Sequence, residues 1–303
     1  MNSILVIGGT GFLGSAVVRE LARRPASANF QFTLPTRRRD KAKHLLVLPT
    51  ADVIDADVHD PATLARLMQG QDAVISLVGV FKGGEGQPYG NGFARAHVEL
   101  PRKIATAARA AGVRRVLHVS ALQAAADAPS GYLRSKAAGE AVLREAGLDL
   151  TIFRPSVVFG PGDAFLNLFA RMARIAPFFP LAGADARFQP VWVEDVAATI
   201  ADSLARAESI GASYDLCGPQ QYSLRQLVKY AAAAGGHPRL VIGLPQAVAW
   251  LQAWAMEFIP NGPMTRDNMR SMRVASVCDS GCRLPFGRVA TPLELVAPTY
   301  LRG

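Results

Sequence analysis

The sequence has few charged residues, few aromatic residues and only three cysteines among its 303 positions. Charged side chains make up 19% of the chain and hydrophobic side chains 50%, and this balance excludes an intrinsically disordered protein and a coiled coil. Repeats and low-complexity tracts are also absent. What remains is a globular protein that is long enough to build one large hydrophobic core or two joined cores.

The cysteines Cys217, Cys278 and Cys282 are too few for a disulfide framework. Three residues separate Cys278 from Cys282, and no pair of histidines lies near them, so the spacing of a zinc site is missing. We therefore expect three reduced thiols and no metal site.

We expect no secretory leader, since the first residues lack a basic region and a small-residue cleavage site, and the sequence has no long uninterrupted hydrophobic run. The most apolar stretch, residues 240–259, contains Pro245, Gln246, Gln252 and Glu257, which makes it a poor membrane-spanning helix and a candidate interfacial one. We expect a cytoplasmic protein, with peripheral contact to the inner face of a membrane as the alternative. The net charge of +9 favours anionic partners, but without a basic stripe with interleaved aromatic residues we expect no nucleic acid.

Short β-rich runs alternate with helical patterns through the first half of the chain, which is typical of a parallel sheet covered by helices. The sequence thus predicts an α/β fold with a doubly wound parallel sheet and a smaller, mostly helical C-terminal region. We place the first domain at residues 1–159, with residues 189–218 returning to it, and the smaller substrate or partner region at residues 160–188 and 219–303. Strands are expected at residues 4–7, 30–34, 53–54, 73–80, 116–119, 150–153, 191–193 and 214–217.

Two local patterns stand out in the C-terminal region. Ser223 and Gln226 have the spacing of a capping box at the start of a helix. Trp250, Trp254 and Phe258 recur every four residues and so lie on one face of a helix. Core packing is the first interpretation of this aromatic row, and a surface that meets a membrane or a partner is the second.

A glycine-rich segment directly follows the first expected strand and opens the first expected helix. Gly8 permits a tight turn, Gly11 lets the backbone approach a pyrophosphate, and Gly14 allows close packing of helix on strand. The helix N-terminus supplies N–H donors and a partial positive charge. The segment therefore predicts a dinucleotide site whose first contacts are Gly8, Thr10, Gly11, Phe12, Leu13 and Gly14.

The end of the second strand indicates which dinucleotide binds, because an acidic residue there would bind a ribose 2′-hydroxyl and an arginine would bind a 2′-phosphate. The chain has Arg37, Arg38 and Arg39 at this point, and Asp40 only after them. We expect NADP(H), with NAD(H) as the alternative. Further cofactor contacts are expected at the ends of the third and fourth strands, from Asp57, Val58, Leu77, Val78 and Gly79.

Tyr132 and Lys136 are four residues apart on one face of an expected helix. A phenol has a pKa of about 10, so it needs a fixed cation nearby to act as an acid or base near neutral pH. A lysine one turn away supplies that cation and also reaches the nicotinamide ribose. We predict Tyr132 and Lys136 as catalytic residues that also contact the cofactor.

These motifs resemble the short-chain dehydrogenase/reductases, in their extended or atypical branch, and the resemblance implies a Rossmann fold. It covers nearly the whole chain, since residues 154–160, 191–197 and 214–218 also resemble landmarks of that branch. More narrowly, residues 132–140, 165–170, 265–267 and 290–295 resemble the NAD(P)H-binding accessory subunit family of respiratory complex I and its bacterial relatives. The resemblance adds the cofactor contacts Val119, Ser120, Pro155, Ser156, Val157 and Val158.

One departure from the family pattern concerns catalysis. The family carries a catalytic serine or threonine about two residues beyond the position of Ser120, where this chain has Leu122. Loss of one hydroxyl donor to a substrate oxygen lowers the rate on the order of 100-fold in comparable sites. Whether the protein is an enzyme is thus left open by the sequence.

Three functions are consistent with the sequence. The first is an NADP(H)-binding oxidoreductase that acts on a lipophilic carbonyl or quinone-related substrate. The second is a non-catalytic module that holds its nucleotide for assembly or redox sensing in a membrane respiratory complex. The third, a nucleotide-sugar epimerase or dehydratase, rests on fold analogy. The five histidines are expected to be structural or solvated, and Asp185 and Arg187 to be surface charges.

Overall fold

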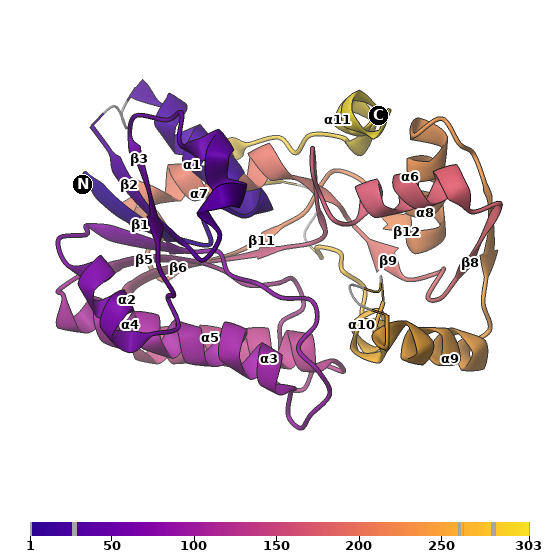
Figure 1. Cartoon of the computed structure of the whole chain (residues 1–303), viewed down its shortest axis with the longest axis horizontal. Helices are drawn as coiled ribbons and strands as arrows, with labels where there is room; N and C mark the ends of the chain where they lie inside the picture. The colour runs from indigo at the N-terminus through magenta and orange to yellow at the C-terminus, as the bar shows by residue number, and fades with distance from the viewer. Residues whose placement is uncertain (1, 26–28, 260–261, 263, 280–282, 303) are drawn as a thin grey trace.

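The computed structural model describes residues 2–25, 29–259, 262, 264–279 and 283–302. A central sheet occupies one side of the molecule, and a smaller lobe of helices and short strands occupies the other (Figure 1). Cys282 lies outside the described residues.

The central sheet has seven strands, all parallel, in the order β11-β6-β5-β4-β1-β2-β3. The chain thus starts in the middle of the sheet, winds outward to β3, and then crosses back past β1 to fill the other half. The α/β fold predicted from the sequence is confirmed. The strands are β1 Ser3–Ile7, β2 Gln31–Thr36, β3 Ala51–Asp55, β4 Ala73–Ser76, β5 Arg115–Val119, β6 Asp149–Pro155 and β11 Ser213–Leu216.

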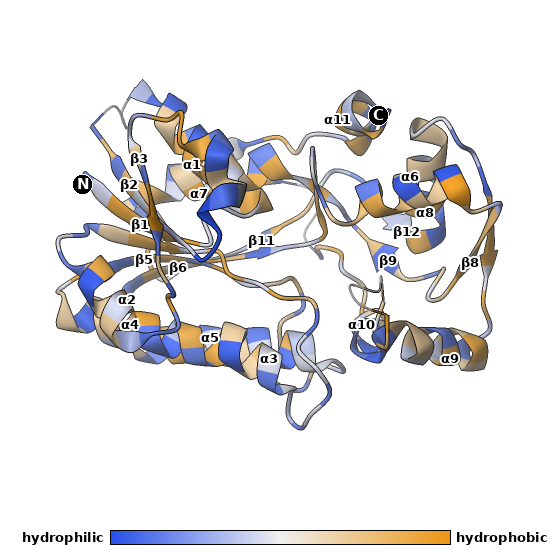
Figure 2. Cartoon of the chain, in the orientation of Figure 1, coloured by the Kyte–Doolittle hydropathy of each residue, from blue (hydrophilic) through white to orange (hydrophobic). Residues whose placement is uncertain are grey.

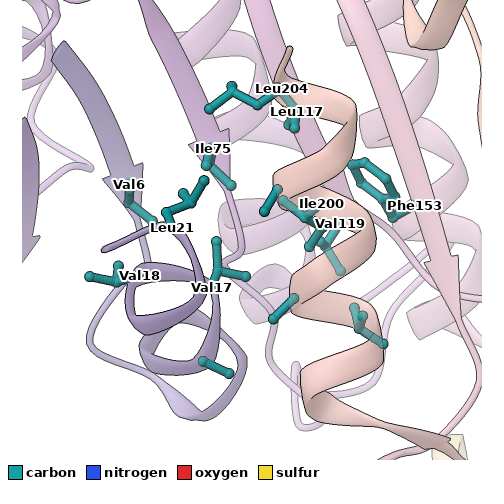
Figure 3. Close-up of a cluster of buried hydrophobic side chains, with 14 of the residues drawn as sticks. Val6, Val17, Val18, Leu21, Ile75, Leu117, Val119, Phe153, Ile200 and Leu204 are labelled. Atoms are coloured by element: carbon teal, nitrogen blue, oxygen red, sulfur yellow. The ribbon is translucent and has the colours of Figure 1, made fainter. Parts of the chain in front are cut away.

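Helices cover both faces of this sheet (Figure 1). One face carries α1 (Phe12–Arg23) and α7 (Val193–Leu204), which pack against each other, and the other carries α2 (Pro61–Met68), α4 (Leu100–Ala110) and α5 (Gly131–Glu145). The strands are mostly hydrophobic, while the helices carry both hydrophobic and hydrophilic residues (Figure 2), as expected for a sheet buried on both faces. Figure 3 shows part of the core between the sheet, α1 and α7, with Val6, Val17, Val18, Leu21, Ile75, Leu117, Val119, Phe153, Ile200 and Leu204 labelled.

The helix that leads into α4 is not regular. A short helix, α3 (Asn91–Phe93), passes into a π-helical turn at Ala94–Glu99 before α4 begins. π-Helical turns are rare and occur often at functional sites. This turn contains His97, which is buried.

Three two-stranded sheets accompany the central sheet in the described part of the chain; two belong to the smaller lobe, and the third, β7 (Val158–Phe159) with β10 (Val191–Trp192), packs largely on the core of the central sheet. Ser223 and Gln226 form the predicted capping box at the start of α8. The strands of the other two sheets pair as β9 (Arg187–Phe188) with β12 (Tyr222–Ser223), and β8 (Phe178–Leu181) with β13 (Leu240–Gly243). The helices of this lobe are α6 Leu166–Ile175, α8 Leu224–Ala234, α9 Gln246–Glu257, α10 Arg266–Ser271 and α11 Leu293–Leu301. The 3₁₀ turns at Arg39–Leu45, Ala207–Ser209 and Pro285–Gly287 contact elements of the central-sheet side, β3 or α7.

The sequence predicted two strands after residue 160 in the central sheet, and only one of them lies there. β11 pairs with β6 at the edge of that sheet, as predicted. The strand at Val191–Trp192 instead pairs with β7 in a separate two-stranded sheet, so this prediction is wrong. β10 has only two residues, and they pair with β7, the short strand that follows β6, instead of with β6 itself. The domain boundaries stay a prediction.

Two of the three cysteines are joined, which corrects the expectation of reduced thiols. Cys217 follows β11, Cys278 lies in the segment after α10, and a disulfide links them across 61 residues of sequence, with their Cα atoms 6.1 Å apart. The spacing of the cysteines in the sequence did not predict this disulfide, because the two residues become neighbours only when the chain returns to the central sheet at β11.

The aromatic row on α9 is only partly packed. Trp250 is half-buried, whereas Trp254 is 45% exposed and Phe258 72% exposed. Core packing, the first interpretation of the row, is therefore wrong for Trp254 and Phe258, which pack edge-to-face on each other at the surface. None of the helices in the described part of the chain combines the length and apolar character that a membrane span requires.

Candidate cofactor and active site

The glycine-rich segment forms the turn between β1 and α1. Gly8 has φ +85°, a conformation in which side chains other than hydrogen are strained. A Cβ on Gly14 would lie 2.2 Å from the carbonyl oxygen of Gly8, so the helix packs against the turn at a distance that only glycine permits. A Cβ on Gly11 would meet a single neighbour, at 3.3 Å, because this residue faces solvent. Each glycine thus has the conformation or packing that the sequence predicted for it.

The N-terminus of α1 is available to an anion. Gly11 is the N-cap and provides no side chain for the first N–H groups, and the first turn contains no acidic residue. The Thr10 and Thr36 hydroxyls are 3.4 Å apart, which brings the end of β2 beside the turn. The N-terminus of α1 thus has free N–H donors and a partial positive charge, and no side chain blocks access to it. These properties suit the binding of a pyrophosphate.

Arg37 and Arg38 follow β2 and are exposed. Neither forms an ion pair with a residue that the structure describes, so both guanidinium groups are available to an anion. Ala56 donates its N–H to the Thr36 carbonyl, so Asp57 and Val58 lie beside the end of β2, as expected for neighbouring parallel strands. The side chain of Asp57 accepts the His59 N–H at 3.0 Å, which occupies one of its oxygens.

The remaining predicted contacts lie where β4, β5 and β6 end. A Cβ on Gly8 would be 3.2 Å from the Val78 nitrogen, so the residues after β4 lie against the glycine turn. Ser120 donates its N–H to Phe153, and its hydroxyl is buried without a hydrogen-bond partner among the described residues. A buried hydroxyl of this kind requires an acceptor or donor. The structure thus brings Leu77, Val78, Gly79, Val119, Ser120, Pro155, Ser156, Val157 and Val158 to the carboxyl edge of the sheet, beside the glycine turn.

Lys136 lies in the second turn of α5 and points back at the sheet. Its Nζ donates to the carbonyl oxygens of Val119, at 3.1 Å, and Val78, at 3.5 Å. Burial lowers the pKa of Lys136 to about 8, against the smaller opposite effect of Glu140. Glu140, one turn further on, is held by Arg154 of β6 with two hydrogen bonds of 2.8 and 2.5 Å, which fixes the face of α5 that carries the lysine.

Tyr132 lies in an aromatic surrounding at the N-terminal end of α5. Its ring centroid is 5.5 Å from those of Phe81 and His97 and 6.0 Å from that of Phe93. Burial raises the pKa of the Tyr132 phenol above its usual value of 10. Without a cofactor, the phenol therefore keeps its proton at neutral pH.

His97 links the π-helical turn to the segment after β4 and to α5. The Val80 N–H donates to Nε2 at 3.1 Å, so Nδ1 carries the proton and donates to the Ser135 hydroxyl at 2.9 Å. Ser135 in turn donates to the Tyr132 carbonyl at 2.7 Å. Burial, followed by the charge of Lys136, lowers the pKa of His97 to about 2, in keeping with this neutral tautomer.

His118 of β5 is buried, and neither ring nitrogen has a hydrogen-bond partner among the described residues. Burial, followed by the charge of Lys136, lowers its pKa to about 3. Side chains alternate along a strand, so His118 lies on the same face of the sheet as Ser120. The sequence analysis expected both His97 and His118 to be structural or solvated and did not place them at the site; a polar residue inside an otherwise hydrophobic strand was the available signal for His118.

A residue from the smaller lobe holds the start of α5. The Asp267 carboxylate of α10 accepts the N–H of Gly131 at 2.7 Å and that of Tyr132 at 3.0 Å. The Ser130 hydroxyl accepts the next free N–H, that of Leu133, at 3.2 Å. The resemblance pointed to residues 265–267, but nothing in the sequence pattern showed that Asp267 caps a helix more than a hundred residues earlier.

Leu122 is buried and donates its N–H to Pro155, so it is part of the packed wall of the site. Gln123 beside it has φ +64°, a conformation that is uncommon for residues other than glycine. Asp185 and Arg187 lie outside this site. The Asp185 side chain is 93% exposed, and Arg187 is exposed and donates to Gln221, which agrees with their interpretation as surface charges.

Comparison with known proteins shows which proteins this chain resembles. A family model described as NAD(P)H-binding matches residues 8–163. The alpha subcomplex subunit 9 of mitochondrial NADH dehydrogenase [ubiquinone] 1 from Rattus norvegicus is 32% identical, over 98% of this chain and 79% of its own length. A ceramide reductase from Caulobacter vibrioides is 33% identical, over 83% of this chain and 78% of its own length.

Among solved structures, an NADPH-dependent quinone oxidoreductase of Escherichia coli in complex with NADPH shares the fold, with a TM-score of 0.77 at 24% identity, over 99% of this chain and 100% of that one. The family to which the chain belongs follows from the family model and the two relatives, and the glycine turn and the Tyr132–Lys136 pair agree with it. The chain belongs to the NAD(P)H-binding family and is related to subunit 9 of mitochondrial NADH dehydrogenase and to a ceramide reductase.

Proposed function

We propose that the protein is an NADPH-dependent reductase of a lipophilic carbonyl compound, and that its smaller lobe contributes to the substrate region. The observation that carries the proposal is the position of Lys136, whose Nζ lies on the Val119 and Val78 carbonyls at the strand ends, one turn from Tyr132. In the proposed binding mode, the phenol and the ammonium group both face the nicotinamide. The proposed contacts of the dinucleotide are the glycine turn, the strand ends, Arg37 and Arg38.

The proton comes from Tyr132 in this mechanism. Bound NADPH supplies a hydride to the carbonyl carbon. The phenol donates its proton to the carbonyl oxygen, so that C=O becomes CH–OH, and the tyrosinate takes a new proton from solvent. The Lys136 ammonium stabilises the tyrosinate. The phenol carries its proton at neutral pH, as a proton donor in reduction must, and burial raises its pKa further.

The surroundings of the phenol favour a lipophilic substrate. Phe81 packs on Tyr132 and is itself 67% exposed, and Val274 belongs to the same hydrophobic cluster as Tyr132. Two related proteins bear names that specify lipophilic substrates, a ceramide reductase and, in fold, a quinone oxidoreductase. Sugar hydroxyls would find few polar partners on this wall, which is an argument against the epimerase alternative.

The first experiment measures oxidation of NADPH with 2-dodecanone, decylubiquinone and UDP-glucose as substrates. We expect turnover with a lipophilic compound and none with UDP-glucose. Tyr132→Phe should lower kcat at least about 100-fold while the Kd for NADPH changes less than about threefold, because the phenyl ring keeps the packing and loses only the proton. Equal turnover by the Tyr132→Phe variant would contradict the proposal, and Tyr89→Phe serves as the matched control.

The choice of NADPH rests on Arg37. An exposed guanidinium bound to a phosphate contributes about 1.4 kcal/mol, so Arg37→Ala should weaken NADPH about tenfold and leave NADH nearly unchanged. Isothermal titration of both dinucleotides checks this, with Arg39→Ala as the matched control. A parent protein that binds NADH more tightly than NADPH would overturn the assignment.

A second function is favoured by one specific observation. Leu122 is buried where the family has a hydroxyl donor, and subunit 9 of NADH dehydrogenase is a relative along nearly the whole chain. We propose as the alternative a nucleotide-holding subunit of a membrane-associated respiratory complex. Release of bound nucleotide by denaturation of the purified protein separates the two. Tightly held, non-exchanging NADP(H) together with no turnover of any carbonyl would favour this alternative.

A further inference from the structure

The smaller lobe contains a cavity of about 360 Å³ that belongs neither to the glycine turn nor to the Tyr132–Lys136 pair. It lies between the segment after β8, the segment that joins β13 to α9, and α10. Its volume is within the range of small-molecule sites, about 300–1,000 Å³. Nothing in the proposed reductase mechanism uses it.

The lining of the cavity is apolar on one side. Leu244, Ala249 and Trp250 come from the start of α9 and the segment before it, Met269 comes from α10, and Met272 directly follows α10. Methionine thioethers adapt to flexible apolar ligands, and Trp250 is fixed from outside by the Arg270 guanidinium, 5.3 Å from its ring. This side is suited to a hydrocarbon chain.

Two arginines lie on the rest of the lining. The Arg225 guanidinium lies against Gly243, where a Cβ would be 2.5 Å from Nη2, and it donates to the Val241 carbonyl at 3.5 Å. Its only ion-pair partner in the described part of the chain is Asp185, at 3.6 Å, whose side chain is 93% exposed and is easily displaced. Arg273 is exposed and forms no ion pair with a described residue.

The cavity lies on the far side of α10 from the active-site helix. Helical residues are offset by about 100° each, so Met269 and Met272 project from the side of α10 opposite to Asp267. Asp267 holds the N-terminus of α5. Gly183 completes the wall, since a Cβ there would lie 2.6 Å from the Met272 sulfur. The cavity and the active site therefore share one helix but no surface.

We propose that this cavity binds a single-chain anionic amphiphile, with the hydrocarbon chain along Trp250 and Met272 and the acidic head group on Arg225 and Arg273. Guanidinium groups recognise carboxylates and phosphates with paired hydrogen bonds, and an apolar wall beside two arginines matches a chain with one acidic end. The proposal does not depend on turnover, so it can be tested independently of the proposed function.

Binding is measured by isothermal titration of the full-length protein with dodecyl phosphate below its micelle concentration. We expect at least tenfold tighter binding than for inorganic phosphate, dodecanol or dodecyltrimethylammonium, and about a fourfold gain for each methylene added from octyl to decyl phosphate. Equal affinity for inorganic phosphate would mean a simple anion site, and equal affinity for the cationic amphiphile would mean nonspecific apolar binding; either result overturns the proposal.

Two sets of variants locate the ligand. The double variant Arg225→Gln/Arg273→Gln should weaken dodecyl phosphate at least tenfold, while Arg174→Gln, an exposed arginine of α6, should not. A brominated alkyl phosphate should quench tryptophan fluorescence, and Trp250→Phe should remove this quenching while Trp254→Phe keeps it. Quenching that depends on Trp254 instead would place the chain on the exposed face of α9 and contradict the cavity assignment.

Discussion

Acidification from pH 6.5 to pH 4.5 should destabilise the cofactor-free protein by about 5 kcal/mol through two histidines alone. Burial lowers the pKa of His97 to about 2 and that of His118 to about 3, while the unfolded chain titrates them near 6.5. Below pH 6.5 the unfolded state therefore binds more protons than the folded state. The stability from these groups is present above pH 6.5 and is lost as the pH falls, at about 1.4 kcal/mol per histidine and pH unit.

Urea denaturation between pH 7 and pH 4.5 measures this dependence. His118→Leu should remove about half of it, because His118 has no hydrogen bond to lose and its neutral ring is replaced by an apolar side chain in an apolar layer. A slope equal in His118→Leu and the parent protein would show that the ring is hydrated in the folded state.

Lys136 acts in a separate window of pH. Burial lowers its pKa to about 8, against an ordinary value of 10.5, so the unfolded state again binds more protons, now between pH 8 and pH 10.5. Stability from this group therefore rises with pH through that window, and below pH 8 the buried charge lowers stability. The acid window of the two histidines can be measured without interference from the lysine.

The sheet could be predicted from the sequence because its central strands are short apolar runs, and strands alternate with helical patterns through the first half of the chain. Ile4 to Ile7 has no polar residue, which only a strand buried on both faces tolerates, and Gly8 follows it at once. β10 was misplaced because a pattern two or three residues long does not show which strand is its neighbour. The Cys217–Cys278 bond was missed for the same reason: pairing is decided by the path of the chain, not by spacing.

The candidate site was predictable where the chemistry is local. The turn at Gly8–Gly14 and the spacing of Tyr132 and Lys136 on one helix are both properties of neighbouring residues. The groups that hold these residues come from distant parts of the chain and have no local signature. His97 enters through a π-helical turn, and Asp267 enters from α10, so neither could be assigned before the fold was known.

Removal of the Asp267 carboxylate should destabilise the protein by about 4 kcal/mol and lower activity together with stability. Asp267→Ala leaves the N–H groups of Gly131 and Tyr132 at a largely buried helix end without acceptors, at about 1–3 kcal/mol each, and removes a negative charge from the positive end of α5. Asp267→Asn keeps one acceptor oxygen and should lose about half as much. Urea midpoints measure the stability, and Asp127→Asn, an exposed carboxylate before α5, is the control.

The same variants test whether α10 positions the catalytic tyrosine or only stabilises the fold. If Asp267 fixes Tyr132 over the cofactor, Asp267→Asn should lower kcat at temperatures where the protein stays folded, while the Kd for NADPH is unchanged, because the glycine turn is held by other contacts. A purely structural role would lower the urea midpoint and leave kcat intact. Since α10 also forms one wall of the cavity in the smaller lobe, an effect on kcat would make this helix the physical link between that cavity and the proton donor.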